Sequence, residues 1–171
     1  MRKLSAVLVL VIIAVSGCGQ VAEVEAPAPD LQKIHDELVD AQMKYAEAWC
    51  NKDMAAISTM WSHDDDISLW GPAERDRVQG WEGPNGVKAW YEAAMATMDK
   101  VDFKINGLLI KVGDDGTSAI VTYYVENDFV DYDGNAGKMT PRVTVVKVIQ
   151  DGEWKQVHGD ASFSIAEVNA M

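Results

Sequence analysis

The chain has 171 residues, of which 48% are hydrophobic and 25% are charged, the composition of an ordinary globular domain. Lys and Arg number 15 against 27 Asp and Glu, so the net charge is −12 at pH 7. Such an acidic surface repels phosphate backbones and has no polybasic patch for anionic lipid. Composition therefore argues against nucleic acid as a partner and against electrostatic membrane binding.

The first 17 residues have the order of a secretory signal. A basic start at Arg2 and Lys3 precedes an apolar run from Leu4 to Val15, which is shorter than the roughly 20 residues of a membrane-spanning helix. Cys18 follows the small residues that end this signal. The arrangement resembles the lipobox of bacterial lipoproteins and implies that Cys18 is lipidated and becomes the mature N-terminus.

Lipidation implies an extracytoplasmic protein that is anchored to a bacterial membrane. Gly19 rather than Asp follows the cysteine, which in a Gram-negative host implies the periplasmic side of the outer membrane. Residues 1–17 contain two positive charges and no acid, so the mature chain has a net charge of −14. Residues 18–29 contain two prolines and no regular period, which predicts a flexible tether.

Cys50 is then the one cysteine left without lipid, which excludes a disulfide framework. It ends a helical pattern beside Trp49. This position predicts a buried, unreactive thiol.

Three helices are predicted in the first part of the domain. Asp30 opens an amphipathic helix whose apolar residues recur from Leu31 to Trp49 at three- and four-residue spacing. Asp53 is a suitable N-cap for a short second helix, and a third helix is expected over residues 87–98. Between these two helices, the pattern predicts a short strand at residues 67–70 and a polar loop at residues 71–79.

After residue 99 the apolar period changes from helical to alternating. Strands are predicted at residues 101–112, 118–131, 139–150 and 153–164. The separators are turn sequences such as Asp151-Gly152, the strongest short signal for a hairpin. Helices followed by a run of antiparallel hairpins predict an α+β fold, in which a bent sheet wraps the long helix as an open cone.

The C-terminal hairpin contains the most specific motifs. Arg142-Val-Thr144, Asp151-Gly-Glu-Trp154, Val157-His158 and Ser162 follow one another. This order resembles the SnoaL-like branch of the NTF2-like superfamily, including the association domain of calmodulin-dependent kinase. The resemblance covers about residues 30–164 and places a SnoaL-like domain at residues 30–165 with a tail at 166–171.

The resemblance implies an NTF2-like cone, with a long N-terminal helix and two shorter helices packed on a strongly curved, mainly antiparallel sheet. It also implies a pocket between the long helix and the concave sheet, and homodimers formed through the open sheet face. Members include isomerases, cyclases, dehydratases, epoxide hydrolases, ligand-binding domains and assembly domains. The fold therefore implies no single function.

Two pairs of polar residues are candidates for the site. Arg142 and Thr144 lie two apart on one predicted strand and share a face, as do His158 and Asp160 on the next. Facing the pocket, Arg142 would bind a carboxylate or phosphate, and His158 with Asp160 would be a base and its partner. The alternatives are an ion pair of Arg142 with an acid and a structural His158.

Departures from the family pattern favour binding over catalysis. Asp160 stands where the motif has a second histidine, and Thr144 stands where relatives that resemble limonene epoxide hydrolase have a general base. An arrangement of the ketosteroid-isomerase type would have to draw on Tyr45, Tyr123 or Asp128. The sequence does not bring these three to one point.

Aromatic side chains are the other candidates for a pocket wall. Trp49, Trp61, Tyr91 and Tyr123 are predicted ligand contacts, because such pockets are mainly apolar. The acidic stretches at residues 63–66 and 131–135 are predicted to be a solvated loop and a turn rather than cation sites. No metal or other cofactor is expected.

These patterns predict a lipid-anchored, homodimeric domain that binds a small, partly apolar ligand without turnover. The ligand is anionic if Arg142 faces the pocket. Two alternatives stay open: a hydrolase, isomerase or lyase that acts on a small molecule through His158 and Asp160, and a homo-oligomeric assembly module.

Overall fold

The computed structural model describes residues 28–71 and 77–163. The predicted signal peptide at 1–17, the lipidation site Cys18, most of the predicted tether and the predicted tail at 166–171 lie outside the described residues. Within the two described ranges, no helix combines the length and the apolar character that crossing a bilayer requires.

Three helices form where the sequence predicts them. Helix α1 spans Leu31–Cys50, α2 spans Met54–Met60 and α3 spans Val87–Ala96. The Asp30 carboxylate accepts a hydrogen bond from the backbone N–H of Lys33 at 3.1 Å, and Asp53 accepts one from Ala56 at 2.9 Å. The predicted N-cap at Asp53 is confirmed, and Asp30 caps the helix that it was predicted to open. Each carboxylate satisfies a backbone donor that the first helical turn leaves free.

Seven strands form one sheet. They are β1 (Ser68–Trp70), β2 (Arg77–Gln79), β3 (Met98–Val112), β4 (Ser118–Asp131), β5 (Ala136–Met139), β6 (Arg142–Gln150) and β7 (Glu153–Ser162). The strand order is β2-β1-β7-β6-β4-β3, and β5 pairs with β4. Neighbours are antiparallel except β1 and β7. The predicted α+β fold is confirmed: three helices pack on a curved, mostly antiparallel sheet.

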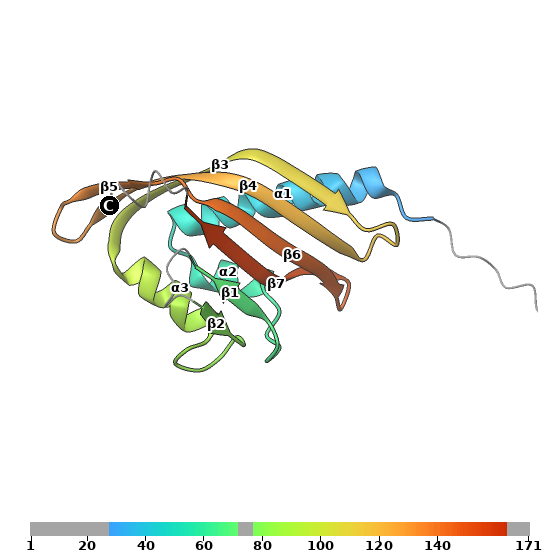
Figure 1. Cartoon of the computed structure of the whole chain (residues 1–171), viewed down its shortest axis with the longest axis horizontal. Coiled ribbons are helices and arrows are strands. Elements are labelled where there is room, and N and C mark those ends of the chain that lie inside the picture. Colours follow the sequence, from blue (N-terminus) through green and yellow to red (C-terminus); the bar gives the residue numbers. More distant parts are fainter. Residues whose placement is uncertain (1–27, 72–76, 164–171) are drawn as a thin grey trace, which may run out of the picture.

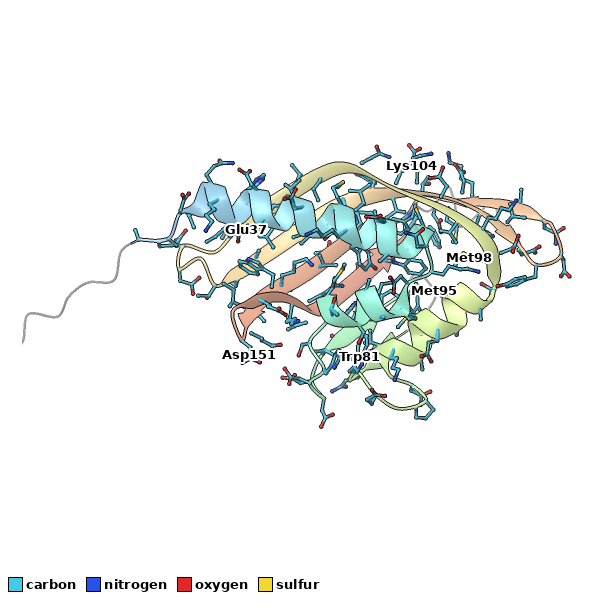
Figure 2. The ribbon with its side chains drawn as sticks, turned by 180° about the vertical axis from the view of Figure 1, so that it is seen from behind. Glu37, Trp81, Met95, Met98, Lys104 and Asp151 are labelled. Carbon is cyan, nitrogen blue, oxygen red and sulfur yellow. The ribbon has the colours of Figure 1, made fainter. Side chains whose placement is uncertain are left out.

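The sheet curves around α1. Figure 1 shows β3 and β4 bending across the molecule, and the view from behind in Figure 2 shows α1 lying along the strands with α2 and α3 below it. A register shift between Asn106 and Leu109 interrupts the pairing of β3 with β4, and Gly107 between them has a φ of 61°. Such a bulge bends a strand and increases its twist, which helps to form the concave face.

Three local predictions are wrong. The predicted polar loop at residues 71–79 contains β2, which pairs with β1. The predicted strand at 139–150 is divided at Pro141, which has no N–H to donate, and its carbonyl accepts from Val125 instead at 2.9 Å. Cys50 is exposed rather than buried, and its Sγ accepts a hydrogen bond from the Phe103 N–H at 3.2 Å.

Candidate functional site

A cavity of about 350 Å³ lies between the helices and the concave face of the sheet. Its volume is within the range of small-molecule pockets, roughly 300–1,000 Å³. Helices α1 and α3 contribute one wall, and all strands except β2 contribute to the other. Met98 begins β3 directly after α3, as labelled in Figure 2, so one short connection joins the two walls.

Strand alternation determines which side chains reach the cavity. On β4 the lining residues are every second one: Tyr123, Val125, Asn127 and Phe129. On β6 they are Val143 and Val145. Successive residues of a strand face opposite sides of the sheet, so these side chains point inward and their neighbours point outward.

An aromatic group forms the apolar floor of the cavity. The Trp49 ring from α1 stacks on the Phe103 ring from β3, with centroids 5.6 Å apart and an interplanar angle of 1°. The Trp90 ring from α3 meets Trp49 edge to face at 6.4 Å. All three residues line the cavity. Such flat apolar surfaces suit a ligand with a planar ring.

A chain of hydrogen bonds leads from the core to the cavity. The Trp61 Nε1–H donates to the Tyr91 hydroxyl at 3.2 Å, and the Tyr91 and Tyr45 hydroxyls lie 2.8 Å apart. Trp61 and Tyr91 are each 1% exposed. Of the three, Tyr45 alone lines the cavity among the described residues.

The direction of these hydrogen bonds follows from which groups can donate and which can accept. An indole N–H donates only, so the Tyr91 oxygen is an acceptor, and the buried Tyr91 proton finds its acceptor in the Tyr45 oxygen. The opposite order would leave the Tyr91 proton buried without an acceptor, which costs free energy. This order leaves the Tyr45 proton without an acceptor among the described residues, at a residue that lines the cavity.

Burial keeps these phenols protonated. Desolvation raises the pKa of Tyr45 above its ordinary value and raises the pKa values of Tyr91 and Tyr123 well above theirs. Each remains a neutral hydroxyl at physiological pH. The cavity thus contains hydrogen-bond donors, not phenolate anions.

The structure places Arg142, Thr144 and His158 on the face of the sheet opposite the cavity. Thr144 pairs with Asp160, which pairs with the exposed Trp70, whereas the adjacent Leu69 lines the cavity. The two members of each pair do share one face of the sheet, as predicted, but that face is the outer one and not the cavity face. The Arg142 guanidinium donates to the Ser162 hydroxyl at 3.4 Å, and His158 Nδ1 lies 2.8 Å from the Ser68 hydroxyl.

Asp160 borders the cavity, but its side chain belongs to the outer face. The Cβ that would be added at Gly159 points inward, toward Leu69 and Trp61. Asp160, the next residue, points outward by alternation, although it is among the residues that line the cavity. Asp128 is also exposed, with its carboxylate 3.7 Å from Lys138 Nζ. Among the described lining residues there is no Lys, Arg or His.

The predicted aromatic contacts lie at or behind the cavity wall. Trp49 and Tyr123 line the cavity, and Trp61 and Tyr91 form the layer behind Tyr45. Sequence reasoning missed Asn127 and Gln156, two buried amides in the wall. The signal for Asn127 was an amide within an otherwise apolar alternation on its strand.

The acidic stretches lie on the surface. Asp64, Asp65 and Asp66 are exposed, and the Asp131 carboxylate accepts hydrogen bonds from the backbone N–H groups of Asp133 and Asn135. Hydrogen bonds of this kind form a turn, as predicted for residues 131–135. No group of three or more His, Cys, Asp or Glu side chains in the described ranges is placed to hold a metal ion.

Comparison with known proteins identifies the domain. The profile of the SnoaL-like domain matches residues 39–166. No curated protein sequence matches the chain.

Solved structures share the fold at low identity. An NTF2-like superfamily protein from Salmonella enterica serovar Typhimurium is 19% identical with a TM-score of 0.68, covering 77% of this chain and 92% of that one. A candidate scytalone dehydratase from Novosphingobium aromaticivorans is 13% identical with a TM-score of 0.68, covering 80% and 88%. The association domain of C. elegans CaMKII is 15% identical with a TM-score of 0.58, covering 77% and 97%.

Proposed function

The chain belongs to the SnoaL-like domain family, and on that premise we propose that it binds a small, uncharged, mainly apolar molecule in its cavity without turnover. The observation that carries the proposal is Tyr45, which lines a 350 Å³ cavity and whose hydroxyl lies 2.8 Å from that of Tyr91. Because Trp61 donates to Tyr91, we infer that the Tyr45 proton is the one left for a ligand. A carbonyl or ether oxygen of a ligand is the matching acceptor. The absence of lining cations among the described residues favours an uncharged ligand over the anion expected from Arg142.

The arrangement of acids and bases supports binding rather than catalysis. An isomerase or dehydratase moves a proton and needs a base within about 3 Å of it. Within the described wall, the sole carboxylate residue is Asp160, whose side chain belongs to the outer face together with His158. The candidate scytalone dehydratase is 13% identical to this chain, so the comparison supports a shared fold but does not identify a base in this cavity.

Native mass spectrometry tests this function directly. Residues 18–171, expressed without the signal and with serine in place of Cys18, would be purified gently from the native host. This form has no lipid, and its described residues are unchanged. A co-purifying uncharged small molecule supports the proposal and identifies the ligand. Conversion of that molecule to a product by the purified chain would contradict binding without turnover.

We expect Tyr45→Phe to weaken binding of a carbonyl ligand about tenfold, because one hydrogen bond in a desolvated site contributes about 1.4 kcal/mol. Prodan, an uncharged naphthyl ketone whose emission shifts to the blue in apolar surroundings, is a suitable probe. The matched control is Arg142→Ala on the outer face, which should leave the Prodan Kd unchanged. Equal losses in both variants would place the probe outside the cavity.

We also propose that the protein is a homodimer that associates through the outer face of its sheet. Leu109, Ile120 and Tyr124 are 70%, 50% and 57% exposed and lie on neighbouring positions of β3 and β4. Exposed apolar side chains that gather on one sheet face mark an interaction surface. The likeness to an association domain favours a second copy of this chain as the occupant.

The order of residues 1–18 supports a further proposal, that lipid on Cys18 holds the domain outside the cytoplasm. Mass spectrometry of the mature N-terminus is expected to find acyl chains on Cys18. A chain that begins at Gly19, without the signal and the cysteine, is expected in the soluble fraction. An unmodified Cys18, or a chain beginning at Gly19 that stays with the membrane, would refute lipid anchoring.

A further inference from the structure

The inner face of β4 contains one side chain that its surroundings do not explain. Asn127 is 6% exposed, and its Oδ1 has no hydrogen-bond partner among the described residues. The flanking inward residues Val125 and Phe129 are apolar. The cross-strand neighbours are Phe103 on β3 and Met139 on β5, neither of which has a side-chain donor.

A second unpaired amide lies in the same wall. Gln156 on β7 is 2% exposed, and its Oε1 also has no partner among the described residues. Both residues line the cavity. Leaving a buried amide unpaired costs free energy that an apolar residue of similar volume avoids, so two such groups in one wall point to an occupant that satisfies them.

We propose that Asn127 determines specificity by accepting a hydrogen bond from a hydroxyl or N–H group of the ligand, with Gln156 as a second acceptor. The inference rests on the proposed binding function and narrows its ligand class. Tyr45 offers a donor and Asn127 an acceptor, and the stacked Trp49 and Phe103 rings offer an apolar surface. The fitting ligand is an uncharged ring compound that has both an acceptor oxygen and a donor group.

The experiment compares β-naphthol with its methyl ether, which have the same ring and differ in the hydroxyl proton. Titration calorimetry would measure both Kd values for the mature Cys18→Ser chain, with Prodan as the reference ligand. We expect the wild-type cavity to bind the naphthol about ten times more tightly than the ether. In Asn127→Leu this preference should fall below about twofold.

Asn106→Leu is the matched control, since Asn106 is exposed on β3 and pairs with the exposed Tyr124. It should keep the preference for the naphthol. Thermal unfolding provides the second readout. Asn127→Leu should melt at the same or a higher temperature without ligand, because it removes an unpaired buried amide, whereas a structural asparagine would give a lower melting temperature.

The outcomes separate this inference from the proposed function. Prodan binding together with equal affinity for naphthol and ether overturns the role of Asn127 and leaves the binding function standing. A preference that survives in Asn127→Leu also overturns it. If Prodan, naphthol and ether all fail to bind the folded wild-type chain, the binding function itself is refuted.

Discussion

Ile120→Asp is expected to convert the proposed dimer into a monomer. Ile120 is 50% exposed on the outer face of β4, between Lys111 of β3 and Val146 of β6. A carboxylate at the centre of an apolar interface loses its hydration without gaining a partner. We expect the dimer Kd to rise at least about a hundredfold, which corresponds to about 2.8 kcal/mol.

Analytical ultracentrifugation of the mature Cys18→Ser chain at micromolar concentration measures this change. The control is Leu31→Asp, because Leu31 is 41% exposed but lies on α1, away from the outer sheet face. It should leave the dimer intact. A wild-type chain that sediments as a monomer would refute the proposed homodimer. An Ile120→Asp variant that still sediments as a dimer would show that the interface does not include Ile120.

Lys147→Met is expected to stabilise the protein at neutral pH. Lys147 is 2% exposed on the inner side of β6, opposite Ala119 and Gln156. Burial lowers the pKa of its ammonium group from 10.5 to about 8. This difference corresponds to about 3 kcal/mol, so the methionine variant should gain free energy of unfolding of that order.

The pH dependence gives the matching signature. The folded-state pKa of Lys147 is depressed, so between about pH 8 and 10.5 the unfolded chain binds more protons than the folded one. The free energy of unfolding of the wild type should therefore rise with pH across this interval. Below pH 8 Lys147 is charged in both states, and the full cost of burying the charge remains. In Lys147→Met this rise of the free energy of unfolding with pH should be absent.

Urea unfolding at a series of pH values tests both expectations. Lys44→Met, at an exposed position on α1, is the control and should change neither the stability nor its slope with pH. A destabilised Lys147→Met variant would mean that the ammonium group makes a stabilising contact. A wild-type stability that is flat above pH 8 would contradict the depressed pKa.

The motif residues of the C-terminal hairpin lie on the outer face of the sheet, away from the cavity. Arg142, Thr144 and His158 are on the side where the second copy is proposed to bind. The Trp70 ring stands beside His158 at 6.2 Å, with the Arg77 guanidinium 4.6 Å from its centre. Arg142, Thr144 and His158 of the C-terminal hairpin are therefore not among the described residues that line the cavity.

Much of the fold could be predicted from the sequence, because the responsible interactions are local. Asp30 and Asp53 cap helices through backbone groups three residues away, and the Asp151-Gly152 turn joins adjacent strands. Strand β2 could not be predicted, because three residues form a strand there through pairing with β1. The break at Pro141 was readable in principle, since proline has no N–H for the ladder.

The α+β class and the pairs of residues that share a face could be read from the sequence, because periodicity and turn chemistry act over a few residues. The family was readable from the order of the motifs in the C-terminal hairpin. The face that lines the cavity could not be read from the sequence. A strand alternates in the same way on either side, so the inward direction of Val143 rather than Arg142 depends on how the sheet curves around α1. The hydrogen bonds from Trp61 through Tyr91 to Tyr45, and the unpaired Asn127, likewise bring together α1, α3, β4 and the residue after α2, so they form only in the folded domain.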